Sequence, residues 1–330
     1  MGQYRKKMEG MFGMTLMNQK NRNITFQIGG KKFIENLRKY GIFYLFLAPT
    51  MIYLLIFSYW PLYGIQIAFR NFNFVGGITG SEWVGLKWFH SFLSSPKFTF
   101  VLKNTLTISL YSLAVGFPIP ILFSLLLQYL PSQRFKKFSQ TVTFMPHFIS
   151  TVIMVNMLSV FLSPTNGFVN TIIKDLGGQP VYFFGKPEYY AHLYIWSDVW
   201  QETGWNAIIY VAALSSVDPG LHEAATIDGA NKIQRIWHVD LPSLFPTMII
   251  LLILRCGSIM SIGFEKSYMM QNAVNLDVSE VISTYVYKIG MQKARYSSAA
   301  AIGLFQNLIN FLLLSIVNTV SRKLGDTSLW

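Results

Sequence analysis

Residues 218–242 read DPGLHEAATIDGANKIQRIWHVDLP and lie between two apolar segments, each long enough to cross a bilayer. Asp218 predicts a helix N-cap with Pro219 as the first helical residue, because proline lacks only an N–H that would be unpaired there. Gly229 can end this helix, since glycine enters the left-handed conformation without steric cost. A second short helix should follow and stop at Leu241-Pro242. The stretch therefore predicts two short helices, each with an apolar face that needs a partner.

This stretch resembles the EAA loop of ABC importer permeases, and a bland surface hairpin is the weaker alternative. The resemblance is carried by Glu223, Ala224, Ala225, Asp228, Gly229, Leu241 and Pro242, with Val239 where the family pattern has isoleucine. It implies the type I importer permease fold, an all-α membrane protein of six transmembrane helices. In that family the loop is cytoplasmic and couples the permease to an ATPase subunit, which is the role implied for these residues.

The composition independently favours a membrane protein. Hydrophobic residues make up 52% of the 330-residue chain and charged residues only 13%, a balance that is too apolar for a soluble domain. The net charge of +12 could suggest a nucleic-acid partner, but in a membrane protein the distribution of charge matters more than its sum. We therefore expect membrane lipid, and no nucleic acid, around this chain.

Six apolar segments can cross the membrane. The expected spans are 42–68, 105–129, 144–162, 191–214, 244–264 and 299–320. The second should bend or break, because it contains Gly116, Pro118 and Pro120. Six spans place both termini on one side of the membrane. We expect a multi-pass protein of the cell membrane, with a permease domain over residues 41–330.

The positive charges suggest which side is cytoplasmic. Residues 1–40 form a basic tail, whose last part (33–40) could be a short surface helix. With that tail inside, the cytoplasmic segments hold about 16 Lys and Arg residues against about ten outside. The bias is modest, but it agrees with an EAA loop that faces an ATPase. Both termini are therefore expected in the cytoplasm.

A wider resemblance covers roughly residues 40–330. Segments such as 146–150, 284–287 and 329–330 are similar to the oligosaccharide and polysaccharide-fragment permeases related to maltose-type importers. This subfamily implies an oligosaccharide substrate, a second homologous permease, a dimer of ATPase subunits and an extracellular solute-binding protein. The chain has no phosphate-binding loop of the G-x-x-x-x-G-K-[ST] type, so it is not expected to hydrolyse ATP. As a transport subunit it is not expected to be an enzyme. No cofactor or metal is expected on this chain, and ATP-Mg should bind to the ATPase partner.

The fourth expected span carries the candidate substrate pathway. Helical spacing brings Asp198, Glu202 and Trp205 near one another, with Trp200 beside them. A carboxylate within the membrane normally faces a partner or a water-filled cavity, and aromatic faces stack on sugar rings. The alternative is that the tryptophans form an interfacial belt and the carboxylates serve packing.

Arg255, in the fifth expected span, has two interpretations. An ion pair with Glu202 or Asp198 is the preferred one, because it explains a buried guanidinium at least cost. The other is contact with an acidic sugar such as a uronate, whose carboxylate a guanidinium fits well.

His147 is expected to be a polar cap. Glu265 and Lys266 could lie at the outer gate or in a loop.

Two other function classes remain open at this point. A secondary transporter would suit the broken second span, but it gives the EAA loop no role. A membrane enzyme is disfavoured, because no nucleophile–base or paired-acid motif stands out around the carboxylates. ATP-dependent transport that disappears without the ATPase would separate an importer from both.

Overall fold

The computed structural model describes residues 30–325 and 328–330, so most of the expected basic tail (1–40) lies outside the described residues. The chain divides into two compact units, residues 1–63 and 64–330. Each unit is described by itself below.

The first unit is one long, broken helix. It comprises α2 (Gly30–Leu54), a π-helical turn η1 (Leu55–Tyr59) and the start of the 3-10 helix η2 (Trp60–Phe69). Tyr40 leaves the helical conformation and kinks α2, which separates the short helical segment expected at 33–40 from the span that follows. Apolar side chains along this span are exposed, among them Phe46 at 76%. Exposure on that scale is what a lipid-facing or partner-facing helix requires.

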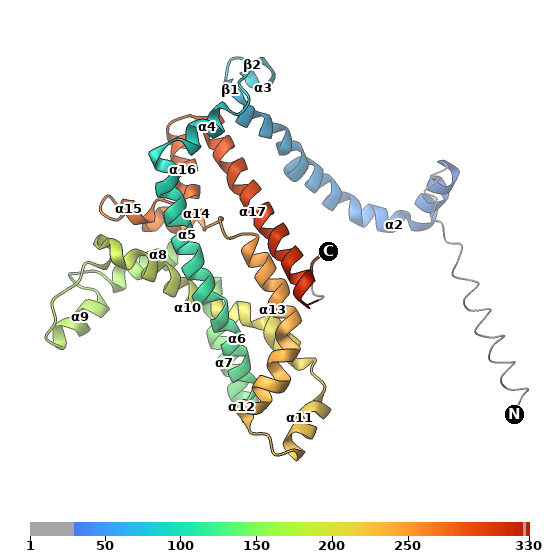
Figure 1. Cartoon of the computed structure of the whole chain (residues 1–330), viewed down its shortest axis with the longest axis vertical. Coiled ribbons are helices and arrows are strands. Elements are labelled where there is room, and N and C mark those ends of the chain that lie inside the picture. Colours follow the sequence, from blue (N-terminus) through green and yellow to red (C-terminus); the bar gives the residue numbers. More distant parts are fainter. Residues whose placement is uncertain (1–29, 326–327) are drawn as a thin grey trace, which may run out of the picture. The chain divides into compact units, whose positions relative to one another are not determined.

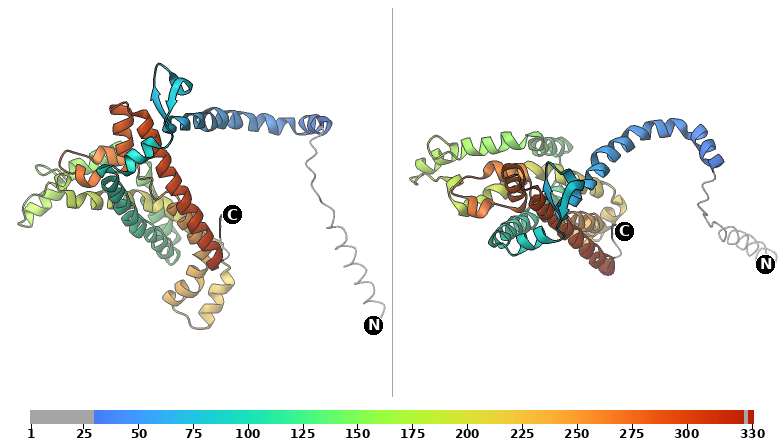
Figure 2. Two further views of the ribbon diagram at one scale, coloured as in Figure 1. Left: turned by 45° about the horizontal axis from the view of Figure 1, so that its top comes forward. Right: turned by 90° about the horizontal axis from the view of Figure 1, so that it is seen from above.

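The second unit begins with a short hairpin and continues as helices. Its elements are β1 (Arg70–Asn73), α3 (Gly77–Gly80), β2 (Ser81–Trp83), α4 (Lys87–Leu93), α5 (Pro96–Gly116), α6 (Pro118–Gln128), α7 (Gln133–Phe144), η3 (Met145–Phe148), α8 (Thr151–Phe161), α9 (Phe168–Asp175), η4 (Phe183–Gly185), α10 (Pro187–Ser215), α11 (Pro219–Ile227), α12 (Lys232–Arg235), η5 (Ile236–Asp240), α13 (Leu241–Cys256), α14 (Phe264–Met270), α15 (Leu276–Ser279), α16 (Ile282–Tyr287), η6 (Lys288–Gln292) and α17 (Tyr296–Gly325). β1 and β2 pair antiparallel, with Arg70 opposite Trp83. α11 and α12 lie at the end of this unit opposite α4 and α16 (Figure 1), and α9 projects from one side of it (Figure 2).

Helix α10 forms the centre of this unit. It packs against α5, α6, α7, α13 and α14. Its buried tyrosines Tyr190 and Tyr194 contribute to one apolar cluster with α5, α8 and α14, and Tyr210 and Leu214 contribute to a second with α6 and α13. Interdigitated side chains of this kind fix helix positions closely, so α10 sets where the polar residues of the unit meet.

Four helical segments within the described residues are long and apolar enough to span a membrane, and a fifth if a sharply bent pair counts as one. The four are Lys39–Phe69, Pro96–Gln128, Lys232–Cys256 and Tyr296–Lys323. The expected first and sixth spans are found as helices. The second is interrupted at Phe117, between α5 and α6, as its glycine and prolines predict.

The third expected span needs correction, and the fourth is not confirmed as an apolar span. The third, 144–162, is not a straight span, because Gln133–Phe148 and Thr151–Phe161 meet at 99°. Ser150 caps α8 by accepting a hydrogen bond from the Ile153 amide, which starts a new helix in a new direction. The fourth is the 29-residue helix α10, which is long enough to cross but too polar to satisfy the same apolarity criterion.

The fifth expected span is also shifted. Its expected bounds are 244–264, but α13 ends at Cys256. Two side chains of α17 hold the turn that follows: Asn310 accepts from the Met260 amide at 3.0 Å, and Gln306 donates to the Met260 carbonyl at 2.8 Å. These bonds satisfy backbone groups that a continued helix would otherwise have paired.

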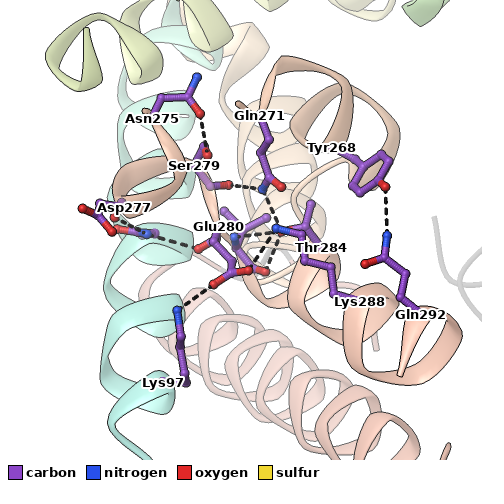
Figure 3. Close-up of polar contacts among 12 residues, drawn as sticks. Lys97, Tyr268, Gln271, Asn275, Asp277, Ser279, Glu280, Thr284, Lys288 and Gln292 are labelled. Atoms are coloured by element: carbon purple, nitrogen blue, oxygen red, sulfur yellow. Dashed lines mark hydrogen bonds and ion pairs between the residues drawn. The ribbon is translucent and has the colours of Figure 1, made fainter. Parts of the chain in front are cut away.

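A polar cluster ties the segment after α15 to the start of α5. The carboxylate of Glu280, only 6% exposed, lies 3.1 Å from Lys97 Nζ and 3.0 Å from Lys288 Nζ (Figure 3). Asn104 donates to the Glu280 carbonyl at 3.1 Å. Burial raises the pKa of the Glu280 carboxyl, but the hydrogen bonds from Lys288 and Lys97 outweigh it and hold that pKa below its usual range. The non-spanning segment is therefore anchored by charge as well as by packing.

Candidate functional site

A polar cavity of about 500 Å³ lies between α5, η3, α10 and the turn after α13. Among the side chains that line it are His147, Asp198, Glu202, Arg255, Glu265 and Lys266. Asp198, Glu202 and Arg255, all predicted for the substrate pathway, thus face one space. Hydroxyl groups from Ser109, Ser112 and Ser258 add hydrogen-bonding capacity to its wall.

A glycine in α10 brings one wall of the cavity into place. A Cβ atom added at Gly204 would lie 2.3 Å from the Thr143 carbonyl oxygen, so α7 can approach α10 this closely only at a glycine. Gln201 then donates to the Ile149 carbonyl at 2.6 Å and holds the turn between η3 and α8. The close approach and this bond position His147 beside α10.

His147 is a hydrogen-bond partner of Glu202. Its Nδ1 atom lies 2.9 Å from Glu202 Oε2, and the two side chains are 27% and 29% exposed. The imidazole also stacks on Trp205, with ring centroids 4.1 Å apart and an interplanar angle of 8°. The prediction of a simple polar cap was therefore incomplete. The pairing joins residues 55 positions apart, which no local sequence pattern reveals.

Asp198 is paired with Lys266 from α14. Lys266 Nζ lies 3.4 Å from Asp198 Oδ1 and donates to the Tyr194 carbonyl at 2.9 Å. The side chain of Lys266 is 8% exposed, so its charge is compensated inside the protein. Lys266 belongs to the cavity wall through this pair, which sequence reasoning left undecided between gate and loop.

The expected ion pair of Arg255 is wrong. Within the described residues, no carboxylate lies within ion-pair distance of Arg255; Glu202 is paired with His147 and Asp198 with Lys266. Arg255 is exposed and lines both this cavity and a neighbouring one of about 290 Å³ beside α6. Glu265, at the start of α14, is also outside every ion pair of the described chain. The cavity therefore presents one uncompensated cation and one uncompensated anion.

The two tryptophans lie apart from this space. Trp205 backs the cavity by stacking on His147 and Phe144 and does not line it. Trp200 lines a separate apolar cavity of about 490 Å³ with Met154, Met157 and Trp196. A helix turn places Trp200 away from Asp198 and Glu202, so the expectation that it flanks the carboxylates is not met.

The stretch 218–242 has the first helix that its sequence predicts. Asp218 caps α11 by accepting from the Gly220 amide at 2.9 Å, with Pro219 at the first helical position. Gly229 has a φ of +81°, the left-handed conformation expected there. Glu223, Ala224 and Ala225 lie on α11, and Asp228 follows at its C-cap. Asn231 and Gln234 then form a capping box that starts α12.

Leu241-Pro242 does not stop the second helix, contrary to the prediction. α12 passes through the π-helical turn η5 into α13, and Lys232–Cys256 forms one candidate span. Pro242 sits in the first turn of α13, where its missing N–H costs least, and the π-helical turn changes the hydrogen-bond register just before it. The second half of the stretch, from Lys232, is thus helically continuous with α13.

Comparison with known protein families gives the identity of this arrangement. Residues 116–326 match the family described as the inner membrane component of binding-protein-dependent transport systems. The chain belongs to this family. As the permease component of an ABC importer it is a multi-pass membrane protein and not itself an enzyme, since ATP is hydrolysed by a separate subunit. Because the chain belongs to this family, it is neither a secondary transporter nor a membrane enzyme, the two alternatives left open by the sequence.

Several relatives of this permease are similar over nearly their whole length. It is 40% identical to the polygalacturonan/rhamnogalacturonan transport system permease protein YteP of Bacillus subtilis (strain 168) over 91% of this chain and 94% of that one. It is 36% identical to Protein LplB of the same organism, over 91% and 95%. Among solved structures, a chain of a bacterial ABC transporter involved in the import of the acidic polysaccharide alginate superimposes with a TM-score of 0.83 at 37% identity, covering 89% of this permease and 99% of that chain. The same transporter in complex with an alginate pentasaccharide-bound periplasmic protein gives 0.82 at 37% identity and the same coverage.

Proposed function

We propose that this permease carries oligosaccharides with acidic residues from an extracellular solute-binding protein into the cytoplasm, driven by ATP. The observation that carries the substrate class is the cavity in which Arg255 has no carboxylate partner, while Asp198 is paired with Lys266 and Glu202 with His147. A guanidinium fits a uronate carboxylate with two parallel hydrogen bonds, and the sugar hydroxyls could donate to Glu265. The polygalacturonan and alginate systems of its relatives move acidic sugars, which favours the same class here.

The proposal includes six spans with both termini in the cytoplasm. Beside the four apolar spans, the bent pair α7–α8 and the polar helix α10 make the fifth and sixth. The polarity of α10 is consistent with spanning, because Asp198 and Glu202 face the cavity and not lipid. Residues 41–330 then constitute the permease domain, with a cytoplasmic basic tail over 1–40.

Residues 218–242 are proposed to be the cytoplasmic EAA coupling loop. Apolar side chains on this loop are exposed: Leu221 at 51%, Ile227 at 86%, Ile233 at 67% and Trp237 at 65%. A group of exposed large apolar residues at the end of a helical unit is typical of a docking surface. The proposed occupant is one subunit of an ATPase dimer that binds ATP-Mg. Within the loop, Glu223, Asp228 and Gly229 define the motif, with Ala224, Ala225, Leu241 and Pro242.

A second homologous permease would complete the pathway. The cavity is open at the surface of this single chain, so the sugar would be enclosed only when another subunit covers it. Alternating access would then follow from the two permeases rocking on their coupling loops. Asp198, Glu202 and Arg255 are proposed to line the pathway, while Trp205 supports it through His147 and Trp200 faces a different cavity.

Reconstitution tests the proposal. The permease, its partner permease, the ATPase and the binding protein are placed in proteoliposomes with galacturonate oligosaccharides outside. Uptake should require ATP inside and should vanish when the ATPase is omitted. Uptake that persists without the ATPase, or ATP hydrolysis with no uptake of any galacturonate or neutral oligosaccharide, would contradict it.

A further inference from the structure

Three residues from separate elements meet where residues 218–242 join α13. Asp240 is the last residue of η5 and its side chain is fully buried. Tyr129 caps the end of α6, and His222 lies on α11. Asp240 is the residue between Val239 and Leu241, a position at which the EAA pattern prescribes no residue type. No part of the proposed function assigns a role to this aspartate.

The Asp240 carboxylate joins the other two side chains. Tyr129 Oη donates to Asp240 Oδ2 at 2.5 Å. His222 Nε2 lies 3.3 Å from Asp240 Oδ1, within ion-pair distance although not aligned as a hydrogen bond. Burial and the hydrogen bond to Asp240 raise the pKa of the Tyr129 phenol, so Tyr129 remains the protonated donor. α6 and α11 are thus linked through one buried acid.

Arg235 strengthens the same junction from α12. Its guanidinium lies over the Tyr129 ring, 5.6 Å from the centroid, and its Nη1 donates to Thr226 Oγ1 on α11 at 3.1 Å. The cation–π contact adds a second attachment of the loop to Tyr129. Three segments of residues 218–242 therefore meet around Asp240: η5 contacts Tyr129 and α11, and α12 contacts Tyr129 and α11.

The chain itself does not provide this link. α11 is connected by backbone to α10 on one side and through η5 to α13 on the other, but Tyr129 precedes Asp240 by 111 residues. Apolar packing of α6 against α10 and α13 could slide by small amounts, since it is not directional. A buried carboxylate tolerates little displacement, because losing a partner leaves its charge uncompensated.

We propose that Asp240 is a positioning residue that makes the coupling loop and the inner end of α6 move as one body. This inference rests on the proposed function of residues 218–242 as the ATPase-docking loop. When the ATPase displaces the coupling loop, the displacement reaches α13 through the continuous helix formed by α12, η5 and α13, and it reaches α6 through Asp240. α5 and α6 form one span, and α5 lines the polar cavity. The link therefore joins the site of ATP-driven motion to a wall of the pathway.

The test measures ATP hydrolysed per galacturonate oligosaccharide transported by the reconstituted complex, together with its Tm. The variants are Tyr129→Phe, Asp240→Asn, His222→Gln and the double change Tyr129→Phe with Asp240→Asn. Tyr182→Phe is the matched control, because it removes the hydroxyl of an exposed tyrosine outside the coupling stretch. We expect Tyr129→Phe to raise the ATP consumed per sugar by roughly two- to tenfold, the effect of one lost hydrogen bond. The control should leave the ratio unchanged.

The double variant separates positioning from stability. If the two residues act through one contact, the double change should be no worse than the more damaging single change. A lower Tm with an unchanged ratio of ATP to sugar in Tyr129→Phe and His222→Gln would mean that the cluster is only structural, and would overturn the inference. If the Asp240→Asn complex does not assemble, the ATP-to-sugar ratios of Tyr129→Phe and His222→Gln test the inference without it. Failure of the wild-type complex to transport would instead contradict the proposed function.

Discussion

His147 and Glu202 form a hydrogen bond of 2.9 Å that connects the turn before α8 to the middle of α10. Trp205 stacks on the face of the imidazole ring, while the carboxylate contacts Nδ1 at the ring edge. This pair, together with that of Asp198 and Lys266, accounts for two of the carboxylates of the cavity. Neither carboxylate pairs with Arg255.

Trp205→Leu should raise the KM for sugar uptake, whereas Trp200→Leu should leave this KM unchanged. Trp205 positions His147 and through it Glu202, so its loss should raise the KM for uptake by roughly two- to tenfold, in line with one weakened polar contact. Trp200 is the matched control, because it is an equally exposed tryptophan on the same helix that lines a different cavity. Equal effects of the two substitutions on KM would contradict the assignment of the cavity.

Arg255→Met should leave the Tm of the complex close to that of the wild type and should abolish uptake of galacturonate oligosaccharides selectively. Arg255 has no ion pair within the described chain, so its removal strands no buried carboxylate there. Uptake of a neutral oligosaccharide, measured as a competing substrate, should be affected less. A Tm decrease that Glu202→Gln reverses would show that Arg255 instead neutralises Glu202, and would refute the carboxylate-binding role.

Gly229→Val should weaken the complex with the ATPase, whereas Gly229→Asn should be tolerated. The φ of +81° disfavours a β-branched residue by about 1–2 kcal/mol, while asparagine adopts this conformation more readily. Nothing lies within 4 Å of a Cβ atom added there, so the effect comes from the backbone and not from a clash. Affinity of the permease for the ATPase provides the measurement. Tolerance of valine would mean that the turn is not needed for docking.

The Glu280 cluster should make stability depend on acid. Because the folded pKa of Glu280 lies below its ordinary value, its contribution is complete above a pH of about 4.3 and is lost as the pH falls toward the lower folded pKa. Lys288→Met should lower the Tm more than Lys97→Met, since the Lys288 side chain is 21% exposed and that of Lys97 is 50% exposed. Thermal unfolding at pH 7 and in acid checks both statements. Equal losses for the two lysines would contradict this ranking.

The sequence predicts the parts of this fold that are governed by local chemistry. The cap at Asp218, the left-handed Gly229 and the interruption between α5 and α6 all follow from the conformational limits of proline, glycine and short polar side chains. The placement of Asp198 and Glu202 on one wall follows from helical spacing.

The features that sequence reasoning missed depend on contacts between distant segments. The 99° bend before α8 is held by Gln201 of α10, and the early end of α13 is held by α17. The partner of Arg255 was predicted from charge and depth alone. The depth of Arg255 in the membrane could not show that His147 and Lys266 lie closer to Glu202 and Asp198 than Arg255 does. The one detectable signal was Gly204, a glycine inside a long helix, which marks the close approach of α7.

The central claim is that the cavity between α5, α10 and the turn after α13 opens and closes with the ATP cycle. The direct measurement is the rate at which a membrane-impermeant thiol reagent labels Glu202→Cys in the reconstituted complex, in a background with Cys256→Ser. We expect the labelling rate to differ by about fivefold or more between the nucleotide-free and the ATP-bound complex, which is the lower end of typical coupling between two sites. The change should disappear when Gly229→Val uncouples the ATPase. A labelling rate that is the same in both nucleotide states would contradict the account.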